Sequence, residues 1–228
     1  MEPSAAALAT DLSFSINEEP HPLCLLAAEK LQQYLRQQQW DHDFRLIGKM
    51  FGVLVVRTRQ HELGYLAAFS GKLAGTNDHP DFVPPIFDGL TEGSFVNRGM
   101  TKLTQINEKI KLLETSENNS RQVHHLKVYR KAHSINLQNK IFDQYHFLNK
   151  AGVSKSLLEI FNRKPPAGAG ECAAPKLLQY AFQHHMEPLA LAEFWWGLSP
   201  KSAHWKHGHF YPPCKEKCSS ILQHMLTV

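Results

Sequence analysis

MFGVLVV at residues 50–56 and GYLAAF at residues 64–69 are the two segments that decide the fold. Polar residues 57–62 separate them. Two short apolar runs around a polar connection are typical of a β-hairpin that is buried on at least one face. Because the connection is longer than a two-residue turn, the register of the hairpin stays open. A third run, residues 189–196, is almost continuously apolar and predicts a further buried strand.

Helical periodicity surrounds these strands. Apolar residues recur at helical spacing from Pro22 to Trp40, which predicts an amphipathic helix before the hairpin. Steps of three and four between Met100 and Leu113 define a narrow helical stripe, and a second helical segment follows at residues 123–148. Because polar residues 114–120 separate these two helical segments, we expect an antiparallel helical hairpin.

Turn-forming residues mark the remaining boundaries. Residues 71–89 carry three prolines and predict a surface loop, and residues 154–161 predict a short helix. Consecutive prolines and glycines at residues 163–170 form the best internal boundary, because they stop helices and strands alike.

We therefore expect an α+β fold: a small sheet with covering helices and an inserted helical hairpin. The 228 residues fit one domain with an insertion or two small domains. We expect an N-terminal α+β part with the β-hairpin at residues 1–98, the helical hairpin at residues 99–150, and a Cys/His-containing part at residues 151–228.

Composition excludes several classes of protein. Hydrophobic residues make up 43% and charged residues 20%, which excludes a disordered chain. No apolar run approaches the roughly 20 residues that span a bilayer, and no basic residue precedes the first apolar stretch, so we expect a cytoplasmic protein without a membrane partner. Four cysteines without a secretory signal indicate reduced thiols or metal ligands. A net charge of +4 with 14 histidines permits nucleic acid binding without requiring it.

Five sequence blocks are long and rare in composition. They are PHPLCLLAAE at residues 20–29, GKMFGVLVV at 48–56, GECAAPKLL at 170–178, LAEFWWG at 191–197 and HGHFYPPCKEKC at 207–218. Together they resemble the N-terminal extension of RluA-type pseudouridine synthases of gammaproteobacterial and related types. The resemblance covers residues 11–226.

The resemblance implies an accessory, RNA-facing domain that acts with a pseudouridine synthase catalytic domain, in cis or in trans, on rRNA or tRNA. Enzymes of this type isomerise uridine with the aspartate of an Arg-Leu-Asp motif, followed by a Thr-Ser-Gly-like turn. This chain contains no Arg-Leu-Asp. We therefore expect no catalytic residue and no isomerisation by the chain alone. Similar proteins continue into their catalytic domain after the segment at residues 221–226, so we expect a truncated product or a free-standing relative of the extension.

Cysteine and histidine side chains in the last third of the chain predict a zinc site, formed by Cys172, Cys214, Cys218 and His209, with His207 as an alternative to His209. Thiolates and imidazoles suit zinc, and four of them close a tetrahedron. On a helix, the spacing of Cys214 and Cys218 places both sulfurs on one face. The alternative is that Cys172 is a small core residue and the histidines belong to a solvated loop. Zinc is the only cofactor that the sequence indicates.

Two of these cysteines are predicted at helix N-termini. Glycines at 168 and 170 precede Cys172, and the prolines at 212 and 213 favour a helix start near Cys214. A helix N-terminus stabilises negative charge, so a thiol there has a lowered pKa. We expect the sulfurs of Cys172, Cys214 and Cys218 to converge even without a metal.

The order of hairpin, Cys172 helix, apolar strand and Pro-Cys helix also resembles the zinc-dependent nucleobase deaminases. Those enzymes place a glutamate two positions after a His or Cys ligand, and a Pro-Cys-x-x-Cys motif follows. Here Ala174 holds the glutamate position. Deamination is therefore expected to be lost or to run through Glu171 or Glu193. The alternative function is thus a zinc-binding, deaminase-like domain with lost or altered catalysis, on a cytidine-deaminase-like form of the α+β fold.

Residues 121–140 carry five cations and three histidines but no acidic residue. Such a segment can follow a phosphate backbone. The predicted RNA-binding residues are Arg121, Lys127, Arg130, Lys131 and Lys140. The alternative is a solvated helix face.

Three adjacent aromatic residues, Phe194, Trp195 and Trp196, either stack on bases or belong to the core. The continuous apolar run around them favours the core.

Overall fold

The computed structural model describes residues 14, 16, 19–38, 40, 47–115, 119–200 and 204–228. They form two compact units. The first unit joins residues 1–86 to residues 146–228, and the second contains residues 87–145. The N-terminal and C-terminal parts of the chain thus share one unit, and the helical hairpin is inserted between them.

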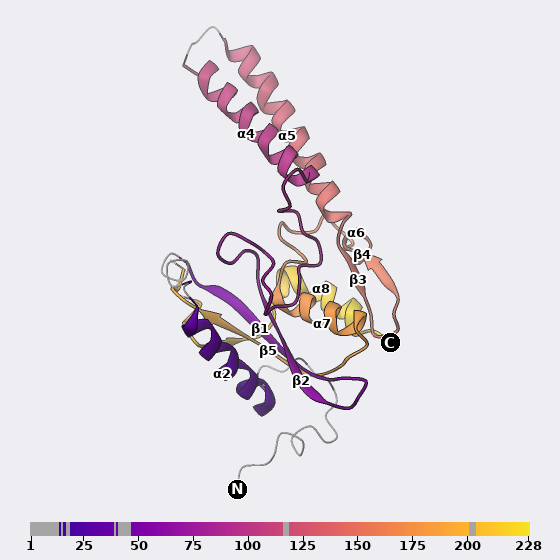
Figure 1. Ribbon diagram of the computed structural model, residues 1–228. Coiled ribbons are helices and arrows are strands. Elements are labelled where there is room, and N and C mark those ends of the chain that lie inside the picture. Colours follow the sequence, from indigo (N-terminus) through magenta and orange to yellow (C-terminus); the bar gives the residue numbers. More distant parts are fainter. Residues whose placement is uncertain are drawn as a thin grey trace. The chain divides into compact units, whose positions relative to one another are not determined.

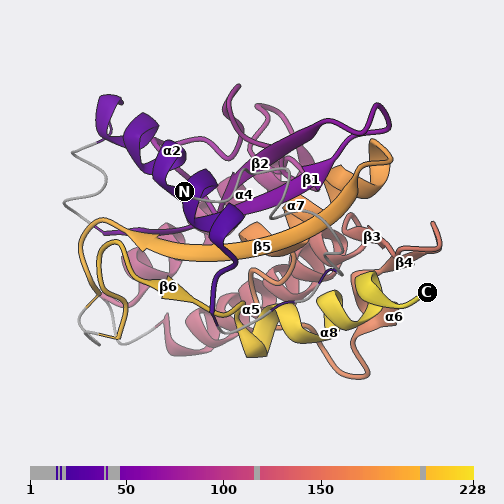
Figure 2. The ribbon, with the colours of Figure 1, turned by 90° about the horizontal axis from the view of Figure 1, so that it is seen from below.

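A four-stranded antiparallel sheet is the centre of the first unit (Figure 2). Its strands, in the order β2-β1-β5-β6, are β2 (Leu63–Phe69), β1 (Lys49–Arg57), β5 (Glu187–Trp196) and β6 (Phe210–Tyr211). The predicted hairpin is present, and its open register is settled by the pair Phe51 and Phe69 at one end and Arg57 and Leu63 at the other. The predicted strand at residues 189–196 lies within β5, which pairs with β1. The expected α+β fold is therefore confirmed.

Helix α2 (Pro22–Gln37) packs on one face of the sheet (Figures 1 and 2). Its apolar stripe forms a core with strand residues that include Phe51, Phe69 and Phe194, all with at most 1% of their surface exposed. The rings of Phe51 and Phe194 stack with centroids 5.9 Å apart. The helix ends at Gln37, close to the predicted Trp40.

Helix α7 (Ala173–Gln183) covers the other face, and helix α8 (Lys215–Leu226) packs against α7. Gly52 of β1 makes the close approach of α7 possible. A Cβ atom at this position would lie 2.9 Å from the Ala173 Cβ atom and 3.0 Å from Leu177 Cδ1. The first turn of α7 therefore rests directly on the strand backbone, which positions Cys172 just outside the sheet.

A two-stranded sheet and a short helix complete the first unit. They are β3 (His146–Leu148), β4 (Ser154–Ser156) and α6 (Leu157–Ile160). The helices expected at residues 123–148 and 154–161 are wrong at residues 146–148 and 154–156, which form strands. The helix before them ends at Phe142, and His146 to Leu148 pair instead with Ser156 to Ser154. A capping box between Ser156 and Glu159 starts α6 only after β4.

The second unit contains the predicted helical hairpin, α4 (Phe95–Leu113) and α5 (Ser120–Phe142) (Figure 1). Ile106 and Ile110 of α4 pack against Val123 of α5. Helix α4 begins before the predicted Met100 because the Ser94 side chain accepts a hydrogen bond from the Asn97 amide at 3.1 Å and caps the helix. No helix in the described residues is long and apolar enough to cross a membrane.

Candidate functional site

A pocket of about 330 Å³ lies where the N-termini of α7 and α8 meet the sheet. Four of the five sequence blocks contribute to its lining. The contributions are Met50 from block 48–56, Glu171, Cys172 and Ala173 from block 170–178, Glu193 and Trp195 from block 191–197, and Pro212, Cys214 and Lys217 from block 207–218. Segments far apart in the chain thus meet at one place.

The cysteines occupy the helix starts that the sequence predicted. Cys172 is the N-cap residue of α7 and Cys214 is the N-cap residue of α8, and neither side chain makes a capping hydrogen bond. Cys218, one turn further along α8, is fully buried. A hydrogen bond with Cys172, burial, and the charges of Cys172, Glu193 and Cys214 all raise the pKa of the Cys218 thiol. Cys172 and Cys218 are therefore in contact, and Cys214 is near enough to Cys218 to act on it electrostatically.

The predicted fourth ligand lies elsewhere. His209 is exposed, does not line the pocket, and its carbonyl accepts a hydrogen bond from the Trp195 amide at 2.9 Å. The alternative ligand His207 accepts a hydrogen bond from the Gly197 amide through Nδ1 at 2.9 Å and packs on the Trp196 ring. Within the described residues, no three His, Cys, Asp or Glu side chains are arranged to hold a metal ion. The zinc site therefore stays a prediction.

Glu193 brings a buried carboxyl group to the pocket. Only 4% of its surface is exposed, and its Oε1 atom accepts a hydrogen bond from the Ala174 amide at 3.0 Å. Burial raises the pKa of Glu193 to about 7, although the Ala174 hydrogen bond acts in the opposite direction. The neighbouring strand thus places the Glu193 carboxyl group against Ala174, the residue that holds the glutamate position of the deaminase pattern.

Lys176 is a buried cation that the sequence analysis did not single out. Its Nζ atom donates a hydrogen bond to the Phe69 carbonyl at 2.9 Å and lies 5.0 Å from the centre of the Phe69 ring. Burial lowers the pKa of Lys176 to about 8, while the charges of Glu171 and Cys172 raise it. A lysine inside the apolar block 170–178 was the signal that could have identified it.

Aromatic rings form one wall of the pocket. Trp195 and Trp205 stack with centroids 5.8 Å apart and an interplanar angle of 19°, and both line the pocket. Trp205 also meets Tyr211 edge to face at 4.6 Å. Phe194, Trp195 and Trp196 are all buried, as the core interpretation predicted; Phe194 and Trp196 belong to the core on the α2 side.

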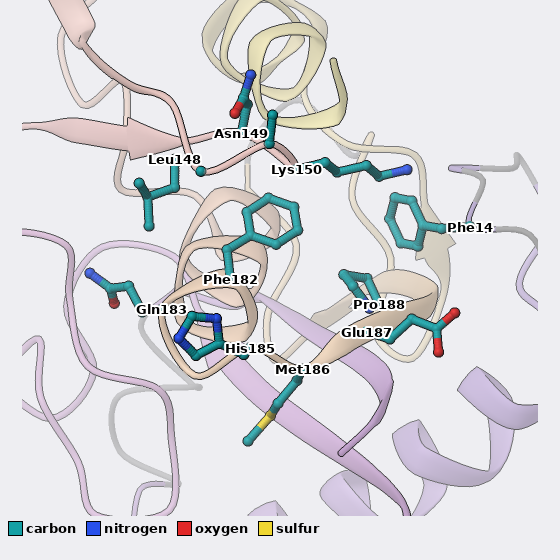
Figure 3. A pocket seen from close by; sticks show the side chains of 12 residues that line it. Phe14, Leu148, Asn149, Lys150, Phe182, Gln183, His185, Met186, Glu187 and Pro188 are labelled. Carbon is teal, nitrogen blue, oxygen red and sulfur yellow. The ribbon is translucent and has the colours of Figure 1, made fainter. Parts of the chain in front are cut away.

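A second, larger cavity of about 1050 Å³ lies at the opposite end of α7 (Figure 3). Figure 3 shows Lys150 from the loop after β3, Phe182 from the end of α7, His185 from the turn that follows, and Pro188 from the start of β5 around it. None of the predicted site residues lines this cavity. We assign it no function.

The five predicted RNA-binding cations, Arg121, Lys127, Arg130, Lys131 and Lys140, are all exposed on α5 of the second unit. Two of them already contact α4. Lys127 forms an ion pair with Glu114 at 2.7 Å, and Arg130 donates a hydrogen bond to Asn107 at 3.4 Å.

Comparisons with protein-family models, with curated proteins and with solved structures found no match. Function is therefore inferred from the chain's own residues and from the resemblance of its five sequence blocks.

Proposed function

We propose that this chain is an accessory, RNA-facing domain of an RNA pseudouridine synthase. The observation that supports the proposal is the convergence of four sequence blocks on one pocket. These blocks carry the resemblance to the extension of RluA-type synthases, and they lie as far apart in the chain as Met50 and Lys217. Segments that served only the stability of the fold would not all need to line one cavity.

The chemistry of the pocket suits an unpaired RNA base. The half-buried Trp205, which stacks on the buried Trp195, supplies an aromatic surface, and unpaired bases in RNA are commonly stacked on such side chains. Glu193, with a pKa of about 7, is present in both protonation states near neutral pH. It can therefore accept hydrogen bonds in one state and also donate one in the other.

Isomerisation itself is assigned to a catalytic domain in cis or in trans. The chain has no Arg-Leu-Asp motif. Among the described residues, Glu193 is the only buried carboxyl group, and its Oε1 atom is held by the Ala174 amide. The chain contributes RNA contacts, and the partner domain contributes the aspartate.

Fluorescence anisotropy with labelled tRNA and rRNA fragments tests this function. We expect binding at 50 mM salt, and we expect Trp205→Ala to weaken it about tenfold, since stacking of one base contributes roughly 1–3 kcal/mol. Tyr65→Ala is the matched control, because Tyr65 is an exposed aromatic residue that does not line the pocket. Absence of binding to both RNAs at low salt would refute the proposal.

One observation favours a second candidate, a zinc-binding, deaminase-like domain with lost or altered catalysis. The Glu193 carboxyl group lies against Ala174, beside the thiols of Cys172 and Cys218. The test is ammonia release from cytidine and from cytidine-containing RNA in the presence of zinc. We expect none. Ammonia release that is lost in Glu193→Gln would replace the first candidate by the second.

A further inference from the structure

We infer that RNA docks on one flank of the helical hairpin, built by α4 and α5 together. The Tyr129 flank, as we name it, consists of Arg98, Lys102 and Lys109 of α4 and Tyr129, His133 and Lys140 of α5. This inference rests on the proposed function, and it moves the contact surface away from most of the cations that the sequence predicted.

The three α4 cations share one edge of their helix. Lys102 and Lys109 follow Arg98 by four and eleven residues, so at 3.6 residues per turn all three lie within about 40° of one another. All three are exposed. Ile106 and Ile110 of the same helix face α5, so the cations run along the border of the packed face.

A contact between the helices identifies the matching edge of α5. The Lys102 Nζ atom lies 5.5 Å from the centre of the Tyr129 ring. The Tyr129 ring in turn stacks on His133, with centroids 6.4 Å apart and an interplanar angle of 24°. Lys140 follows Tyr129 by eleven residues and therefore lies within about 20° of it around the helix. Spacings of four and eleven residues thus occur on both helices. On α4 they separate Arg98 from Lys102 and Lys109, and on α5 they separate Tyr129 from His133 and Lys140.

The two flanks differ in one ion pair. On the opposite flank, Lys127 pairs with Glu114, and Arg130 donates a hydrogen bond to the uncharged Asn107 side chain. On the Tyr129 flank, Arg98 donates a hydrogen bond to the uncharged Gly93 carbonyl. The acidic residue of α4 nearest in sequence to the cations, Glu108, lies about 80° or more around the helix from each of them. On α4, the described residues therefore place no carboxylate beside the three cations of the Tyr129 flank; on α5, Asp143 at the C-cap follows Lys140 by three residues.

The extent of the flank fits a nucleic acid strand. From Arg98 to Lys109 the cations extend over about 16 Å at 1.5 Å per residue. A row of this length matches a polyanion with regularly repeated charges, such as a phosphate backbone. The exposed Tyr129 ring between the cations adds a surface on which an unpaired base can stack.

A pair of charge-reversal variants tests the inference with single-stranded RNA in anisotropy titrations. Lys102→Glu/Lys109→Glu alters the flank. Lys30→Glu/Lys111→Glu is the matched control, because it changes the same charge at two exposed lysines that lie outside the flank and were not predicted to bind RNA. We expect at least a thirtyfold loss of affinity and a salt slope reduced by about two for the flank variant. The control is expected to stay within threefold, and circular dichroism must show unchanged helicity in both.

Three outcomes would overturn the inference. They are equal losses in both double variants, no loss in the flank variant, and binding of polyglutamate or anionic vesicles as tight as that of RNA. Tyr129→Leu should in addition weaken binding about fivefold or more, since it removes a stacking surface. If the wild-type protein binds no RNA at all, the proposed function fails. If the wild type binds and the flank variant does too, only the location on this flank fails.

Discussion

Replacement of Glu193 by glutamine should stabilise the protein, and the gain should depend on pH. The carboxyl group is 4% exposed, and its Oε1 atom accepts a hydrogen bond from the Ala174 amide. Glutamine has nearly the same shape and keeps an oxygen for that hydrogen bond. The substitution therefore removes the charge and leaves the packing in place.

Burial raises the pKa of Glu193 from 4.5 to about 7 in the folded protein. The folded state thus binds the proton more tightly than the unfolded state. The contribution of Glu193 to the stability of the wild type is therefore highest below pH 4.5, falls between pH 4.5 and 7, and stays low above pH 7. At 1.36 kcal/mol per pKa unit, the loss amounts to about 3 kcal/mol. Glu193→Gln escapes this loss, so it should match the wild type near pH 4.5 and exceed its stability by about 3 kcal/mol at pH 8.

Urea unfolding at pH 5, 6, 7 and 8, followed by tryptophan fluorescence, measures the difference. Glu62→Gln is the control, because Glu62 is exposed in the β1–β2 connection and its replacement should have a small effect that does not change with pH. An equal gain for Glu193→Gln at all four pH values would contradict the reasoning. Destabilisation at pH 8 would show that the carboxylate is held by a bound cation.

The structure predicts four further results, three for substitutions and one for the reactivity of the cysteines. Gly52→Ala should destabilise the protein by about 1–3 kcal/mol in urea unfolding, because its Cβ atom has no room beneath α7; a neutral effect would show that α7 can shift. Lys176 has its pKa lowered to about 8, so the wild type should gain stability between pH 8 and 10.5 and Lys176→Met should not; parallel curves would contradict this. Cys24 and Cys218 are buried, and their pKa values are raised. A thiol reagent at pH 8 should therefore label them far more slowly than the half-buried Cys172 and Cys214. Equal labelling rates for all four would show that Cys24 and Cys218 are not buried in solution. His133→Leu should raise the stability by about 1 kcal/mol, because the buried Nε2 atom of His133 has no hydrogen-bond partner among the described residues; a loss would mean that a partner exists in solution.

Local patterns were sufficient for most of the fold. The periodicity of residues 22–40 and the alternation of apolar and polar runs at residues 50–69 depend on neighbours in the chain, and the structure has a helix and a hairpin there. Residues 146–148 show the limit of such patterns. Their apolar spacing continues that of α5, but their backbone pairs with residues 154–156, a contact that no local pattern reveals.

Part of the candidate site could likewise be predicted from local sequence, and part of it could not. Helix starts at Cys172 and Cys214 follow from nearby glycines and prolines, so they were predictable. The contact between Glu193 and Ala174 depends on how a strand lies beneath a helix, and the sequence analysis could name Glu193 only as one of two alternatives. The Tyr129 flank forms only where α4 and α5 pack together. The sequence pattern of either helix alone therefore does not show that the α4 cations belong to it.

We propose that this chain presents RNA to a pseudouridine synthase catalytic domain. The most direct measurement is tritium release from RNA labelled at C5 of uridine, by an Arg-Leu-Asp-containing RluA-type catalytic domain with and without this chain, joined in cis or added in trans. We expect no release by the chain alone, and with the catalytic domain we expect a kcat/KM at least tenfold higher when the chain is present. Release by the chain alone, or a kcat/KM that the chain does not change in cis or in trans, would contradict the account.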